Sequence, residues 1–295
     1  PGYPRLKFSK NNNFIKVDQE TFKYDNLDND FRWNVPIEIV SGKKNEKLLL
    51  TKNNLTTDIK VNDFIYGNLN SNGFYRSEYS EEILANHIFN NLNNLNELEK
   101  FSLVDDLWSS VISNNNNINI FYELCMKLNL DNSTDLQSLI ISAFGVGKRY
   151  SVDDNKVKMI KIVDKYLQDL LDNIGNQYKS SENIKITELR ALIYRGLGIT
   201  CENKEFIEYA KKIYTEYTQD RDSVEPNLAA SSIAIMANNG DEKLHNEFFN
   251  KYLETQIPQE KIRFLYSLSD FKSSDLINNT LEISLTNKIK NQDAP

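Results

Sequence analysis

Histidine, which often binds zinc or transfers protons in enzymes, occurs only twice in these 295 residues, as His87 and His245. Both lie inside helical patterns, EEILANHIFN and DEKLHNEFF. Neither has a second His or a Cys three or four residues away, the spacing that places two metal ligands on one helical face. The motifs HExxH and CxxC are both absent from the sequence. We therefore interpret both histidines as surface or half-buried helix residues and predict no metal site in this chain.

The stretch GVGKR at 145–149 is similar to part of a phosphate-binding loop. In the motif GxxxxGK[ST], however, the first glycine would fall on Ser142. Arg149 stands where Ser or Thr must reach magnesium. We predict instead a loop between helices, closed by Gly145 and Gly147.

The remaining reactive side chains have no partners that their spacing would bring together. Glu81–Glu82 and Asp105–Asp106 are interpreted as helix-start charges or solvated faces. Cys125 and Cys201 are far apart and each has apolar neighbours, which argues against a disulfide framework and favours a reducing, cytoplasmic compartment. A Cys–His catalytic pair is arithmetically possible, but no local motif supports it. The sequence thus predicts no catalytic residue and no cofactor in this chain.

The composition restricts the class of partner. The net charge is −7 and the pI about 5.1, whereas a nucleic-acid-binding protein normally carries a basic stripe. No run approaches the ~18 apolar residues that a membrane-spanning helix needs. We therefore expect neither a nucleic acid nor a membrane as partner. The length allows two domains, each with its own core.

The elements change character near residue 80. Before it, short apolar stretches alternate with clusters of Asn, Asp and Gly, which is typical of short strands in a small antiparallel β-sandwich. Pro36 interrupts one of these runs and predicts an edge strand there. From Ser80 onward the apolar period is helical and the links are short. We predict a β-sandwich domain at 1–79 and an all-α domain at 80–295, arranged as a HEAT/armadillo-like helical repeat or as an irregular α-bundle.

The segment between these two parts, Gly67 to Glu82, reads GNLNSNGFYRSEYSEE. It contains an Asn, a turn Gly and an aromatic-Tyr-Arg-x-x-Tyr run, here Asn68, Gly73, Phe74, Tyr75, Arg76 and Tyr79. This segment resembles the end of the sandwich domain in zinc aminopeptidases of the aminopeptidase N and puromycin-sensitive aminopeptidase family. Gly73 would permit a tight turn. Tyr75 would fill the seam between sheet and helices with its hydroxyl bonded, and Arg76 would bridge carboxylates or carbonyls across the domain junction.

Other segments resemble the same family in the same order along nearly the whole chain. They are GYP at 2–4, RWNVPIEI at 32–39, the helix with Leu189, Arg190 and Gly198, QEKIRFLYSLS at 259–269 and NQD at 291–293. The chain departs from the family at Lys100 or Phe101, where an Arg is usual, and at Asn227 and Ala229, which replace an Asp and an Arg.

The resemblance implies a parent enzyme in which two His and one Glu of an upstream domain hold zinc, and the zinc-bound water attacks the first peptide bond of a substrate. None of those residues can be assigned to a position in this chain, so we expect the chain itself to be non-catalytic and truncated at its C-terminal end. Its expected role is to form the wall of the substrate chamber and to limit peptide access. Its expected partners are the N-terminal and catalytic domains of its own polypeptide and peptide substrates.

Three basic residues are candidates for contact with the C-terminal carboxylate of a peptide, namely Arg190, Lys261 and Arg263. The alternative for each is a structural ion pair or a surface charge. Two other functions also stay open. One alternative is a relative that has lost its zinc site and serves as an interaction scaffold, as one subunit of a general transcription factor does, and the other is an unrelated sandwich-plus-helices adaptor.

Overall fold

The computed structural model describes residues 2–24, 31–179, 181–290 and 293. Pro1 and residues 291–292 of the NQD match lie outside this part of the chain. By backbone contacts the chain divides into two compact units, residues 1–143 and 144–295. The domain boundary at residues 79 and 80 stays a prediction, although the last described strand ends at Tyr79 and the first helix begins at Glu81.

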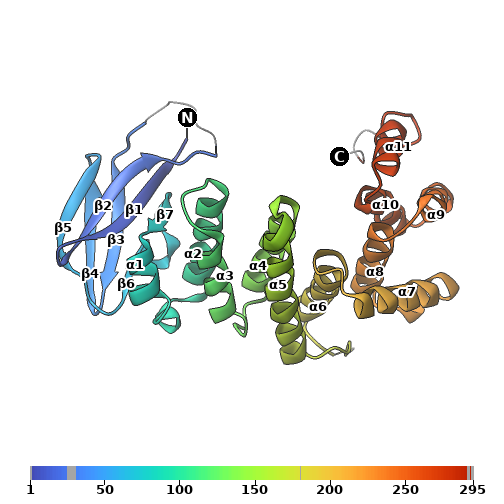
Figure 1. Ribbon diagram of the computed structural model, residues 1–295, viewed down its shortest axis with the longest axis horizontal. Coiled ribbons are helices and arrows are strands. Elements are labelled where there is room, and N and C mark those ends of the chain that lie inside the picture. The colour runs from blue at the N-terminus through green and yellow to red at the C-terminus, as the bar shows by residue number, and fades with distance from the viewer. Residues whose placement is uncertain (1, 25–30, 180, 291–292, 294–295) are drawn as a thin grey trace. The chain divides into compact units, whose positions relative to one another are not determined.

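Among the described residues, seven strands form two small sheets at the start of the chain (Figure 1). They are β1 (Pro4–Asn11), β2 (Phe14–Thr21), β3 (Val35–Ser41), β4 (Lys44–Leu50), β5 (Asn54–Lys60), β6 (Ile65–Gly67) and β7 (Arg76–Tyr79). Their orders are β5-β2-β1-β7 and β4-β3-β6. Alternate side chains such as Phe8, Ile15 and Ile37 are buried, as the period of a strand requires. This confirms the predicted sandwich, with one difference: β7 pairs with β1 in parallel.

The prediction that Pro36 marks an edge strand is wrong, because β3 is the central strand of its sheet. Strand β4 pairs along all of β3, with Pro36 opposite Leu49. On the other side, however, β6 pairs only with Ile39–Ser41. Because Pro lacks an N–H, it fits the end of β3 that has a neighbour on one side only.

Helices fill the rest of the described chain (Figure 1). In the first unit they are α1 (Glu81–Ile83), α2 (Glu97–Ile112) and α3 (Ile118–Lys127), with α4 (Thr134–Tyr150) running on into the second. The second unit continues with α5 (Asp153–Ile174), α6 (Ile184–Arg195), α7 (Lys204–Gln219), α8 (Pro226–Asn238), α9 (Glu242–Glu254), α10 (Pro258–Ser267) and α11 (Ser274–Ser284). The prediction of an all-α second part is confirmed. Among the described residues, no helix is long and apolar enough to span a lipid bilayer.

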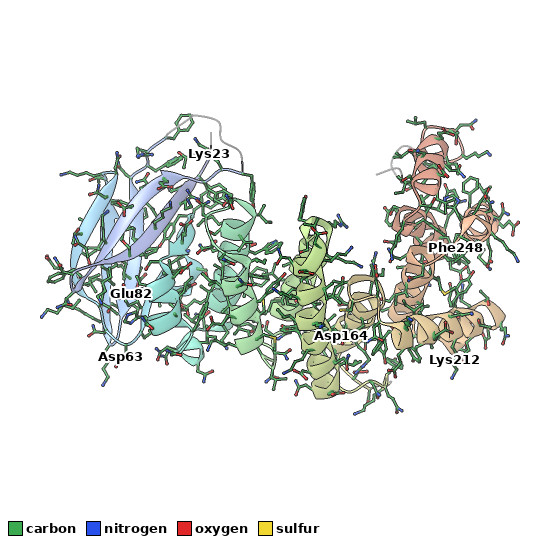
Figure 2. The ribbon with its side chains drawn as sticks, viewed as in Figure 1. Lys23, Asp63, Glu82, Asp164, Lys212 and Phe248 are labelled. Carbon is green, nitrogen blue, oxygen red and sulfur yellow. The ribbon has the colours of Figure 1, made fainter. Side chains whose placement is uncertain are left out.

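The helices from α7 to α11 pack around an apolar core. Phe248 of α9 is fully buried there, against Phe264 of α10 and Phe271 (Figure 2). Helix α7 packs against α8 and helix α9 packs against α10, as short links between helices favour. His245 of α9 is also fully buried, so the prediction of a surface or half-buried histidine is wrong for this residue.

The predicted loop at Gly145 and Gly147 is also wrong, because both residues lie inside α4. Each glycine costs about 1 kcal/mol in a helix interior relative to alanine. The preceding turns of the helix compensate for this, since Leu136, Ile140 and Phe144 are buried. A methyl group on Gly145 would meet no atom within 4 Å, so packing does not require glycine at that position.

Candidate functional site

A groove of about 600 Å3 lies in the second unit, where α8 and α10 meet the end of α6. We call it the α8–α10 groove, and define it by Arg195, Ala230, Ala234, Gln259, Ile262, Arg263, Tyr266, Ser267, Ser269 and Asp270. All of these residues belong to helices or to the turn η6 (Leu268–Asp270) that follows α10.

Helix α10 supplies one wall of the α8–α10 groove because its two faces differ. Pro258 occupies the first turn of this helix, where its missing N–H costs nothing. Phe264, Leu265 and Leu268 are buried in the core. The groove-lining residues of α10 include positions 259, 262, 263 and 266, which have the i, i+3, i+4, i+7 spacing of a single helical face.

Helix α8 supplies the opposite wall with two small side chains. Ala230 and Ala234 are four residues apart and therefore lie on the same face of α8. Their short side chains leave space between the helices that larger residues would fill. Tyr266, which is 52% exposed, adds an aromatic ring to the groove.

The two arginines of the groove differ in their partners. Arg195 Nη2 donates to both carboxylate oxygens of Asp270, at 2.9 and 3.2 Å. Arg263 Nη1 donates to Tyr217 Oη at 3.1 Å, and its guanidinium lies over the Tyr217 ring at 5.7 Å from the centroid. In the part of the chain that the structure describes, no carboxylate lies within ion-pair distance of Arg263. Arg263 thus forms no direct ion pair with a described carboxylate, and Tyr217, which donates to Glu260 Oε1, lies between it and Glu260.

The other two predicted contact residues lie outside the α8–α10 groove. The Lys261 ammonium lies 5.1 Å from the centroid of the Tyr252 ring. Arg190 of α6 is 5% exposed and donates to both carboxylate oxygens of Glu182, at 2.7 and 2.8 Å. It also donates to the carbonyl oxygens of Gly175 and Ile174. These contacts form a structural ion pair at the end of α5, which was the alternative to substrate contact.

The sequence did not point to Arg195 or Asp270. They are 75 residues apart, and no local motif includes either of them. In the structure, Arg195 is the last residue of α6 and directly precedes the π-helical turn η4 (Gly196–Thr200). Such turns often occur at functional sites.

A second polar site lies in the first unit, where β7 meets α2. Arg76 of β7 donates through Nη1 to Asp105 and, at 3.0 Å, to Asp106, both on α2. Asp106 also accepts the Ser77 backbone N–H at 2.9 Å. Burial raises the pKa of the Asp106 carboxyl to about 7, although its bonds to Ser77 and Arg76 act in the opposite direction. Asp105–Asp106 is therefore not the solvated pair that the sequence suggested.

The other predicted junction residues surround this ion pair. The Asn68 side chain bonds both backbone groups of Gly73, and Tyr79 Oη bonds both backbone groups of Gly67. Gly73 does not adopt a left-handed conformation, whereas Asn68 does, with φ 90°. A methyl group at Gly73 would overlap the ring of Tyr75, so this glycine serves close packing.

The expected hydrogen bond of Tyr75 is not present. Its hydroxyl is buried near the backbone of Glu38, and forms no hydrogen bond of ordinary geometry with the described residues. The ring is 6% exposed, so it is held by packing.

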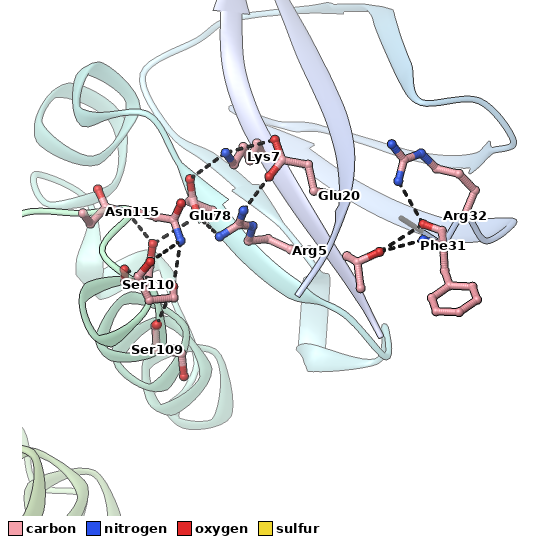
Figure 3. Close-up of polar contacts among 12 residues, drawn as sticks. Arg5, Lys7, Glu20, Phe31, Arg32, Glu78, Ser109, Ser110 and Asn115 are labelled. Carbon is pink, nitrogen blue, oxygen red and sulfur yellow. Dashed lines mark hydrogen bonds and ion pairs between the residues drawn. The ribbon is translucent and has the colours of Figure 1, made fainter. Parts of the chain in front are cut away.

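A second charge network, in addition to the ion pair of Arg76 with Asp105 and Asp106, connects the sheet to α2 (Figure 3). Arg5 of β1 contacts Glu20 on the neighbouring strand and Glu78 on β7. Glu78 accepts a hydrogen bond of 3.1 Å from Ser110 on α2. All of these charged groups have partners within the first unit, so they have a structural explanation.

The described residues do not supply a zinc site. They include no group of three His, Cys, Asp or Glu side chains placed to hold a metal ion. Cys125 and Cys201 are both buried, and neither takes part in a disulfide in the described structure.

A sequence profile described as the ERAP1-like C-terminal domain matches residues 64–295, which include both the Arg76 site and the α8–α10 groove. The chain belongs to the ERAP1-like C-terminal domain family. This finding agrees with the resemblance to the aminopeptidase N and puromycin-sensitive aminopeptidase family, and it covers most of the chain.

Several curated relatives carry aminopeptidase names. The chain is 24% identical to the Tricorn protease-interacting factor F2 of Thermoplasma volcanium, over 99% of this chain and 35% of the relative. It is 23% identical to Aminopeptidase M1-A of Oryza sativa subsp. japonica and 26% identical to Probable aminopeptidase 2 of Sulfurisphaera tokodaii, again over 99% of this chain and 35% of each relative. The chain therefore spans about a third of the length of these relatives.

Proposed function

We propose that this ERAP1-like C-terminal domain forms part of the substrate-chamber wall of a zinc aminopeptidase, where it limits peptide access and binds the C-terminal end of peptide substrates. The observation that carries the proposal is Arg263, a cation that lines the α8–α10 groove and has no carboxylate partner among the described residues.

The groove suits a peptide C-terminus in both charge and shape. A guanidinium binds a carboxylate through two parallel N–H···O bonds, which lysine cannot reproduce. Tyr217 holds Arg263 from one side through a hydrogen bond and its ring face, and thereby limits the positions of the guanidinium. Ile262, Tyr266 and the two alanines of α8 offer apolar surface to the last side chain of the peptide.

In this proposal the chemical step takes place elsewhere in the polypeptide. The zinc ion, its ligands and the residues that read the substrate amino group belong to a part of the enzyme outside these 295 residues. The buried, unpaired Cys125 and Cys201 support a cytoplasmic location for the enzyme.

Peptide binding to this chain tests the proposal. A dye-labelled peptide of about ten residues, with either a free C-terminal carboxylate or a C-terminal amide, is titrated with the chain and followed by fluorescence anisotropy. We expect the acid to bind more tightly than the amide. The variant Arg263→Gln should weaken acid binding about tenfold, because it removes a charge-assisted hydrogen bond, and should leave amide binding unchanged.

The matched control is Lys212→Gln, which removes one positive charge from the exposed surface of α7. Equal binding of acid and amide, or an equal loss in both variants, would contradict the proposal. A second assay places the chain with zinc and an aminoacyl reporter substrate. Turnover there would show that the chain itself is catalytic.

A further inference from the structure

The α8–α10 groove already contains one carboxylate, that of Asp270. Arg195 Nη2 donates to both of its oxygens, so Asp270 occupies the Nη2 donor of Arg195 that an incoming carboxylate would use. Arg195 ends α6, and Asp270 ends η6, directly after α10. Both residues line the groove that also contains Arg263.

The Asp270 side chain can leave this position without any change in the fold. Its backbone is fixed, because its carbonyl oxygen accepts a hydrogen bond of 3.0 Å from the side chain of Asn238 on α8. The next residue, Phe271, is 2% exposed and anchored in the core. Rotation about the side-chain bonds of Asp270 is therefore enough to release Arg195.

The ion pair between these residues is weak enough to be displaced. The Arg195 side chain is 46% exposed, and ion pairs with one exposed partner contribute little to stability. Burial also raises the pKa of the Asp270 carboxyl, although Arg195 and Arg149 oppose this shift, so the charged form is disfavoured in its present place.

We propose that Asp270 competes with the carboxylate of the ligand: it occupies the Nη2 donor of Arg195 in the empty groove, and a peptide C-terminus gains this donor by displacing it. This inference rests on the proposed function of the groove. In this inference Asp270 lowers the affinity of the groove for every carboxylate ligand. It thereby selects ligands whose carboxylate binds Arg195 more tightly than Asp270 does.

The competition also predicts a pH dependence. The charged groups that face Asp270 are Arg195 and Arg149, with Arg263 in the same groove, and none of these arginines loses its proton near neutral pH. A peptide C-terminus has a pKa of about 3.5, below that of an ordinary aspartate. Because burial raises the pKa of Asp270, acidification should protonate Asp270 before the peptide C-terminus, free Arg195 and tighten acid binding.

The test uses the acid and amide peptides with the variant Asp270→Asn, which keeps the shape of the side chain and removes its charge. We expect the variant to bind the acid about threefold to fivefold more tightly than the unaltered chain, and to bind the amide equally well. It should also lose the tightening of acid binding that acidification produces in the unaltered chain. In the background of Arg195→Gln, the substitution at Asp270 should have no effect.

The control Asp172→Asn makes the same charge change at an exposed position of α5. An equal gain in this control, or unchanged or weaker acid binding by Asp270→Asn, would overturn the inference, since Asp270 would then act as a positioning residue for Arg195 or not act at all. If Arg263→Gln still weakens acid binding in that case, the proposed function stands without this inference. If acid and amide bind alike to every variant, both fail.

Discussion

Arg76 Nη1 lies 3.0 Å from the buried carboxylate of Asp106, and this bond joins strand β7 to helix α2. Asp105 shares the same nitrogen, so one guanidinium holds two adjacent carboxylates. The other side of the Arg76 guanidinium is also held in place, because its Nε donates to Tyr3 Oη and its Cζ atom lies over the Phe22 ring. The arginine is thus held by the strand side of the junction and presents its charge to α2.

Replacing Arg76 with Met should therefore destabilise the first unit by about 3 kcal/mol, because it leaves Asp106 buried without a cation. Both tryptophans, Trp33 and Trp108, lie in this unit, so urea unfolding followed by tryptophan fluorescence reports on it selectively. Lys10→Met is the matched control, since Lys10 pairs with Glu82 on the exposed surface and should cost less than about 1 kcal/mol. Similar midpoints for the two variants would contradict this account.

Two glycines should respond in opposite ways to substitution with alanine. A methyl group at Gly67 would overlap the ring of Phe8, which is fully buried. Overpacking of this kind typically costs about 1–3 kcal/mol. Gly145 has no atom within 4 Å of the added methyl and lies inside α4, so Gly145→Ala should stabilise the chain by up to about 1 kcal/mol. Circular dichroism during thermal unfolding measures both changes, and destabilisation by Gly145→Ala would show that α4 does not continue through this residue.

The regular elements of this fold followed from local patterns, but the positions of several special residues did not. The change from strand to helix period near Ser80 is a local property, and Ser80 caps α1 by accepting the Ile83 N–H. Pro36 was misjudged because its sheet neighbour β6 is too short to reach it, which is a property of another segment. Gly145 was misjudged because burial of Phe144 and its neighbours outweighs the local cost of glycine.

The residues of the candidate site also differ in whether the sequence alone could identify them. Arg263 was accessible from the sequence because its segment, QEKIRFLYSLS, carries the family resemblance. Asp270 and Arg195 required the fold, since their pairing depends on how α6 and η6 approach each other across 75 residues. Asp106 required it as well, because only its contact with Arg76 distinguishes it from an exposed helix carboxylate.

His245 should make the second unit sensitive to mild acid. Thr280 Oγ1 donates its single hydrogen to Leu276 O at 2.9 Å, so it accepts from His245 Nε2, at 2.9 Å. The Nδ1 atom is buried and has no partner among the described residues, so a proton there would have no acceptor. Burial lowers the pKa of His245 from its usual 6.5, although the charge of Glu242 opposes this.

The direction in which stability changes with pH follows from proton binding by the unfolded chain. Below about pH 6.5 the unfolded chain takes up a proton at His245 that the folded chain does not, so stability falls as the pH falls, by at most about 1.4 kcal/mol per pH unit. His245→Gln, which keeps a donor for Thr280, should remove this part of the dependence. Urea midpoints from circular dichroism at pH 7.5 and 5.5 measure it. An identical pH dependence in the variant would contradict the assignment.

Substitutions at Arg190 and at Arg263 should have different effects: the first should lower stability, and the second should weaken peptide binding. Arg190 donates to Glu182 and to the carbonyl oxygens at the end of α5, where a cation also compensates the helix dipole. Its replacement by Met leaves these groups without a donor in a site where Arg190 is 5% exposed, so we expect a loss of about 3 kcal/mol. Peptide binding per folded molecule should not change, because Arg190 does not line the α8–α10 groove.

Arg263→Gln should show the reverse behaviour. The hydrogen bond to Tyr217 is the only polar contact of the Arg263 side chain within the described residues, and glutamine can keep a donor there, so stability should change by less than about 1 kcal/mol. Acid-peptide binding should weaken about tenfold, as the guanidinium is lost. Urea unfolding by circular dichroism and anisotropy titration of the same samples give the two quantities side by side. Weaker acid binding by folded Arg190→Met would instead place the carboxylate site at the end of α5, and would return Arg190 to the role that the sequence resemblance suggested.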